Sequence, residues 1–135
     1  MAVTVRKRAQ AEFVIADCLA SNAVGDMVRV SADEIAGIYQ VSDMNILNVS
    51  PHLPVGMITR KLTATRCAVQ VGGEVKGVYA GLTPGKQLFI NNLSRLSHVV
   101  PSHPVAGVTW IHPAALALSS TTVLLRMQVP VRMNA

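Results

Sequence analysis

The chain has 135 residues, half of them apolar and only 14% charged, with a formal net charge of +5. This length favours one domain with its own hydrophobic core, and no apolar run approaches the ~20 residues of a membrane-spanning helix. The first ten residues lack the apolar core of a signal peptide, so we expect a protein made and kept in the cytoplasm, without a membrane partner.

The excess positive charge lies in the C-terminal part of the chain. All seven acidic residues occur at or before Glu74, where seven of the twelve basic residues balance them, and the remaining bases follow with no acid among them. This excess of positive charge after Glu74 favours an acidic partner. Its bases are too widely spread, and aromatic residues too few, to predict a direct contact with nucleic acid.

Residues 1–12 form the first feature in chain order. They carry the basic triplet Arg6, Lys7 and Arg8, and we expect an extended N-terminal arm. Two interpretations stay open: a solvated terminus, and an arm that docks on an acidic neighbour. Residues 13–135 are expected to form a single β domain.

Short β-type segments follow the arm. Phe13–Ala16 is the first, with a short helix over 11–20 as the alternative. Residues 24–30 alternate like a strand covered on one face, a polar loop is expected over 31–34, and 35–41 again favours a strand. After an irregular connection, a strand starts at 56–59.

The clearest period of two is in Arg66–Val71, where Cys67, Val69 and Val71 alternate with polar or smaller residues. Such alternation is typical of a strand with one buried face. Gly72 and Gly73 permit a bulge or tight turn before a further strand over 74–79.

Residues 80–90 predict a turn followed by a strand. Pro84 suits position i+1 of a type I or II turn, Gly85 can take the positive φ of a type II turn, and Gly81 belongs to the same structural turn. The same order, a glycine turn leading into a strand, occurs earlier at 23–30.

The second half of the chain repeats the order of the first. Residues 107–111 correspond to 56–59, and residues 121–131 correspond to 66–75. Within the latter pair, Met127–Val129 resemble Val69–Val71. Only 113–118 has a helix-friendly composition, with one helical turn expected. We therefore predict an all-β fold, a small β-barrel or two-sheet sandwich of two similar halves, with pseudo-repeats at about 24–75 and 84–131.

The sequence contains no recognisable reactive centre. The four histidines, His52, His98, His103 and His112, show neither HxH nor HxxxH spacing, so loop histidines are favoured over a metal site. Gly-x-Ser-x-Gly is absent, and the possible carboxylate pairs come from Asp26, Asp33, Glu34 and Asp43 in expected solvated turns. The run Gly81–Lys86 opens a strand and lacks the following Ser or Thr of a phosphate-binding loop.

These absences predict no catalytic residues, no metal and no cofactor, and hence a binding or structural protein. The two cysteines, Cys18 and Cys67, have no CxxC spacing and are expected to be reduced and buried, with a disulfide as the alternative.

Two stretches carry a resemblance to a known family. The run Gly73–Ile90, with its Leu-Thr-Pro-Gly turn at 82–85, and the run Ser119–Leu125 resemble head decoration (capsid cement) proteins of tailed bacteriophages. The resemblance implies a β-rich virion protein on the capsid exterior, assembled in the host cytoplasm. It further implies that the protein clamps neighbouring copies of the major capsid protein, as a homo-oligomer with a trimer favoured, and that Arg6, Lys7 and Arg8 dock on the capsid.

Two other functions stay open. One is a phage receptor-binding or head-fibre appendage module, since similar β units occur in appendages, although the chain lacks a long stalk. The other is a small-molecule-binding β-barrel or minor enzyme.

Overall fold

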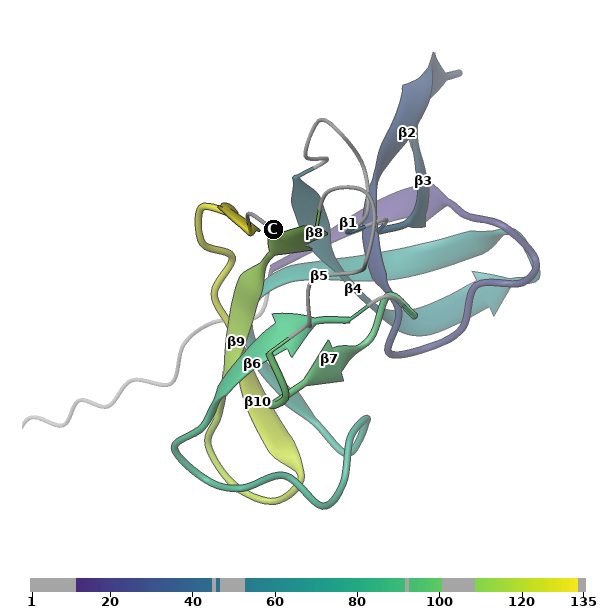
Figure 1. Ribbon diagram of the computed structural model, residues 1–135. Helices are drawn as coiled ribbons and strands as arrows, with labels where there is room; N and C mark the ends of the chain where they lie inside the picture. Colours follow the sequence, from purple (N-terminus) through teal and green to yellow (C-terminus); the bar gives the residue numbers. More distant parts are fainter. Residues whose placement is uncertain (1–11, 45, 47–52, 92, 101–108, 134–135) are drawn as a thin grey trace, which may run out of the picture.

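The computed structural model describes residues 12–44, 46, 53–91, 93–100 and 109–133. Within these ranges the chain forms strands and no helix (Figure 1). The strands are β1 (Glu12–Asp17), β2 (Met27–Ile35), β3 (Ile38–Asp43), β4 (Pro54–Thr63), β5 (Arg66–Lys76), β6 (Gln87–Ile90), β7 (Leu96–Ser97), β8 (Thr109–Ile111), β9 (Pro113–Ala117), β10 (Thr122–Leu125) and β11 (Val131–Met133). The predicted all-β class is confirmed.

Five strands close into a ring in the order β1-β3-β2-β4-β5. β1 closes it, because β1 pairs antiparallel with β5 and parallel with β3. The helical alternative for residues 11–20 is therefore wrong for this segment. Alternate side chains of the ring strands point inward and form a small core made of Ala16, Cys18, Val28, Val41, Ile58, Cys67 and Val69.

The ring continues into an open sheet through β5. The first part of β5 pairs with β1, whereas residues 73–76 pair with β10, and the sheet extends through β9 and β6 to β7 (Figure 1). A second, larger core lies against this part and includes Met27, Met57, Leu88, Ile90, Val123 and Leu125, all essentially buried. Burial of each such side chain stabilises the fold by ~1.5–3 kcal/mol.

The order of the strands is the same on the two sides of the β5–β10 pair. Outward from β5 the neighbours are β4, β2 and β3, and outward from β10 they are β9, β6 and β7. All these pairs are antiparallel. Two similar β halves therefore meet side by side, and β1 is the strand that closes only the first half into a ring.

The turns that open the two halves also correspond. The amide of Asp26 donates to the carbonyl oxygen of Ala23 at 3.0 Å, and the amide of Lys86 donates to that of Thr83 at 3.1 Å. Gly25 and Gly85 occupy the third positions with φ of 100° and 87°. The positive φ expected for Gly85 in a type II turn is confirmed.

Several details of the repeat differ from the sequence-based alignment. The amides of Gly25 and Gly85 donate to the carbonyl oxygens of Ile58 and Ala117, each at 2.8 Å, so β9 corresponds to β4 and the segment 107–111 does not. Residues 127–129 lie outside any strand. The two halves share their backbone pairing but not their side-chain types. An alignment based on similar side chains therefore matched the wrong segments.

Two local expectations were also wrong. Residues 113–118, expected to form a helical turn, contain β9, which lies between β10 and β6. Its alanines are buried there, so pairing on both edges overrides their helical preference. Residues 31–34, expected to be a polar loop, belong to β2.

Candidate functional site

The sequence-predicted site residues fall into two groups. Arg6, Lys7 and Arg8 lie outside the described residues. Gly81 and Gly85 both have positive φ, 71° and 87°, and the amide of Leu82 donates to the carbonyl oxygen of Ser120 at 3.1 Å. This hydrogen bond holds the exposed turn around Pro84 against the β9–β10 connection. The role of Gly81, Pro84 and Gly85 is therefore structural.

The described histidines do not form a metal site. No group of three or more His, Cys, Asp or Glu side chains gathers around a possible metal position within the described ranges. His98 is exposed, and His52 and His103 lie outside those ranges. His112, expected in a loop, is 1% exposed, and neither ring nitrogen has a hydrogen-bond partner among the described residues. Burial lowers the pKa of His112 to about 4.

One expected solvated carboxylate is instead buried. Asp26 accepts a hydrogen bond of 2.9 Å from the amide of Ala23 and forms an ion pair of 3.3 Å with Arg95. Asp43 accepts a bond of 2.6 Å from the amide group of Asn22, and burial, followed by the charge of Asp26, raises the pKa of Asp43. Both carboxylates thus fix the turn that opens the first half.

A third carboxylate joins strands of the ring. Asp17 accepts bonds of 3.0 Å from Gln40 and from Arg66, which lower its pKa in that order of importance. Its partners come from β3 and β5, the two neighbours of β1. This ion pair therefore supports the closure of the ring.

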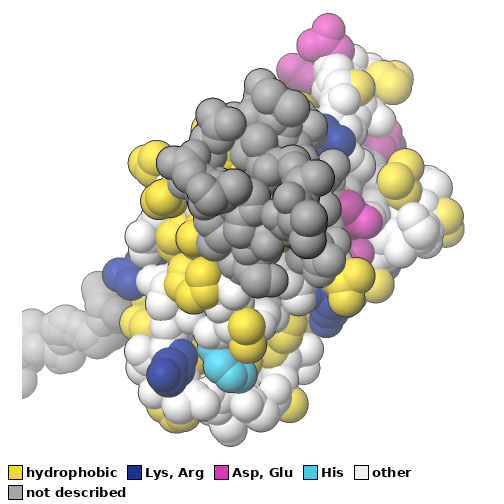
Figure 2. Space-filling view, viewed as in Figure 1, with side chains coloured by type: hydrophobic (Ala, Val, Ile, Leu, Met, Phe, Trp, Pro, Cys, Tyr) yellow, Lys and Arg dark blue, Asp and Glu magenta, His cyan; other side chains and the backbone are white. Residues whose placement is uncertain are grey.

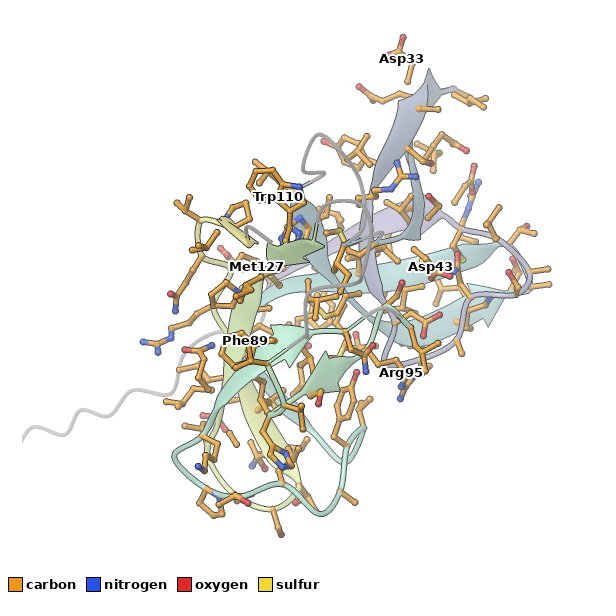
Figure 3. All side chains as sticks on the ribbon, in the orientation of Figure 1. Asp33, Asp43, Phe89, Arg95, Trp110 and Met127 are labelled. Atoms are coloured by element: carbon orange, nitrogen blue, oxygen red, sulfur yellow. The ribbon has the colours of Figure 1, made fainter. Side chains whose placement is uncertain are left out.

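The first surface suited to contact is the end of the β2–β3 hairpin. β2 pairs with β4 only over Met27–Arg29, and every residue from Val30 to Gly37 is exposed. Ala36 and Gly37 have φ of 53° and 80°, which is the type I′ geometry of a two-residue hairpin turn. The hairpin projects from the body, with Asp33 at its far end (Figures 1 and 3).

Apolar and acidic side chains share this hairpin end. Val30, Ile35 and Tyr39 are 53%, 62% and 46% exposed, next to Asp33 and Glu34. Figure 2 shows acidic and hydrophobic side chains together there. Sequence reasoning missed this surface because 31–34 was interpreted as a loop; the Ala-Gly pair between two isoleucines is the signal that identifies it.

The second surface is a groove on the outside of the ring. It has a volume of about 480 Å³ and lies where β1, β4 and β5 run together. Phe13, Ile15 and Leu62 line it and are 53%, 44% and 40% exposed. Ala68 and Gln70 of β5, both largely buried, also line it. The groove is therefore mostly apolar.

Comparison with protein families and curated proteins identifies no relative. No family model matches the sequence, and a search of curated proteins finds no significant match.

Within the described residues no helix is long and apolar enough to cross a membrane. Among the described residues, the exposed side chains that gather are apolar, and the buried carboxylates are held by structural partners. This arrangement favours binding to another molecule.

Proposed function

We propose that the protein is a virion structural protein, a capsid decoration (cement) protein that binds the outer surface of a phage head. In this role it stabilises contacts between subunits of the major capsid protein and acts as a homo-oligomer, with a trimer favoured. The observation that carries the proposal is the grouping of exposed apolar side chains on a projecting hairpin and in a groove of an all-β body.

Isolated exposed apolar residues are normal on a protein surface, whereas apolar residues that gather mark interaction sites. The low charge content of 14% suits a surface that neighbours cover. The resemblance over Gly73–Ile90 adds the capsid as the proposed partner. The Thr83–Lys86 turn within it has the hydrogen bond and the positive glycine φ of a type II turn.

A decoration protein acts through repetition. One modest interface, formed many times on a closed shell, resists internal pressure by avidity, because each contact holds its neighbours in place. The basic triplet Arg6, Lys7 and Arg8 is proposed to lie on an acidic part of the capsid surface.

The test uses expanded heads of the encoding phage, assembled without this protein. Purified protein should cosediment with them up to a fixed number of copies per head and raise their melting temperature. Changing Arg6, Lys7 and Arg8 together to Ala should weaken binding while the circular dichroism spectrum stays unchanged. Failure of the wild-type protein to bind the heads would overturn the proposal.

A receptor-binding or head-fibre module is the second candidate function, favoured by the projecting hairpin, which would reach beyond the particle surface. Labelled particles separate the two functions. A decoration protein covers the whole shell, whereas an appendage marks a vertex or the tail.

A further inference from the structure

No described residue of the chain buries the end of the β2–β3 hairpin. Ile35 lies beside the turn, opposite Ile38, and is 62% exposed. The two-residue turn keeps this end narrow. Val30 and Tyr39, nearer the body, are also exposed but lie on the opposite face from Ile35, because Ile35 pairs with Ile38 and Val30 pairs with Val41. A second molecule that covered these side chains would remove apolar surface from water, which is favourable.

The groove between β1, β4 and β5 is a mostly apolar hollow of about 480 Å³ that offers a site for such an end. No residue of the β2–β3 hairpin lines it. The Oγ1 atom of Thr59 is buried at the groove and has no hydrogen-bond partner among the described residues. An unpaired buried hydroxyl is costly, and an inserted backbone is able to supply its partner.

The charges of the two surfaces are complementary. The hairpin carries Asp33 and Glu34, and the groove carries Arg60 and Lys76, all four exposed. None of the four forms an ion pair within the described part of the chain. Glu74 also lines the groove, so its formal charge is +1 against −2 on the hairpin. Opposite charges around an apolar centre steer association and fix its register.

We propose that the end of the β2–β3 hairpin of one copy docks in the β1–β4–β5 groove of a second copy. Ile35 fills the apolar centre, and Asp33 and Glu34 face Arg60 and Lys76. The inference deepens the proposed function, on whose homo-oligomer it rests, by naming the contact between copies. Because hairpin and groove are different surfaces, the contact is head-to-tail. Such a contact gives a closed ring, such as the favoured trimer, when the rotation between copies closes.

Site-directed cross-linking tests the contact directly, without phage heads. Chains carrying Ile35→Cys are mixed with chains of different mass carrying Leu62→Cys and oxidised. Cys18 and Cys67 are buried and should not compete. The matched control replaces Leu62→Cys by Val129→Cys, which is 82% exposed and outside the groove. Heterodimers should form preferentially with Leu62→Cys; equal yields with both partners, or none, would overturn the proposal.

Charge reversal provides the second arm, measured as mass by light scattering across concentration. The pair Asp33→Lys and Glu34→Lys should weaken self-association by about tenfold or more, because like charges then face Arg60 and Lys76. Adding Arg60→Glu and Lys76→Glu to the same chain should restore much of it. A wild-type protein that stays monomeric, or a reversed pair that associates normally, contradicts the contact. Either result would leave head binding, assayed separately, as a distinct question.

Discussion

The hydroxyl group of Tyr79 donates a hydrogen bond of 2.6 Å to the carbonyl oxygen of Gly25. The same hydroxyl accepts a bond of 3.0 Å from the amide of Leu96, and the Arg95 guanidinium lies 5.1 Å from the centre of the Tyr79 ring. Arg95 also pairs with Asp26. The Tyr79 side chain thus connects the start of the second half to the turn that opens the first half. Arg95, which lies against its ring, is labelled in Figure 3.

Tyr79→Phe should therefore destabilise the whole domain. The change leaves the Gly25 carbonyl and the Leu96 amide without their partner, at a cost of about 1–3 kcal/mol. Urea denaturation followed by circular dichroism measures it. Tyr39→Phe is the matched control, because Tyr39 is exposed and its loss should change the free energy of unfolding by less than about 0.5 kcal/mol. Equal midpoints for the two variants would contradict the prediction.

Gly56→Ala should strongly destabilise the ring. A Cβ at Gly56 would overlap the backbone carbonyl of Gln70 and come within 3.1 Å of the Val69 side chain. Backbone cannot move aside as a flexible side chain does, so we expect a loss of about 3 kcal/mol or more. At Gly72, by contrast, a Cβ meets nothing within 4 Å. Thermal denaturation should show Gly72→Ala near wild type, and similar melting temperatures for both variants would refute the argument.

The features that sequence predicted are those that local chemistry determines. Pro84 and Gly85 specify their turn, and alternation in β5 identifies a strand. The expectation of a single buried face was wrong, because Ala68 and Gln70 on the other face are buried as well. β9 escaped prediction because its alanines favour a strand only when β6 and β10 pair with both edges. The groove escaped because Phe13, Leu62 and Gln70 come from three strands that only the closed ring brings together.

The two thiols should be inert in the folded protein. Cys18 and Cys67 are free and buried inside the ring, which confirms the expectation that both are buried, and their reduced state stays a prediction. Burial, followed by the neighbouring Cys18, raises the pKa of Cys67 to about 12, and only a thiolate attacks a disulfide reagent. At pH 8 Ellman's reagent should label them only as fast as the domain unfolds. Ile35→Cys, on an exposed position, should add one rapidly reacting thiol; rapid labelling of the wild-type chain would contradict this picture.

His112 should make the protein less stable in acid. Burial lowers its folded pKa to about 4 from an ordinary value of 6.5, so the unfolded chain binds a proton first as the pH falls. The stability that the neutral ring contributes is thus complete above pH 6.5 and is lost progressively down to about pH 4, by about 3 kcal/mol. His112→Leu removes this titration but leaves those of Asp17 and Asp43, which cancel when the unfolding free energies of the two chains are subtracted. The difference in unfolding free energy between variant and wild type should therefore change between pH 7 and pH 4. The variant should gain stability relative to the wild type as the pH falls. A difference independent of pH would show that the imidazole gains a proton as readily in the folded chain as in the unfolded one.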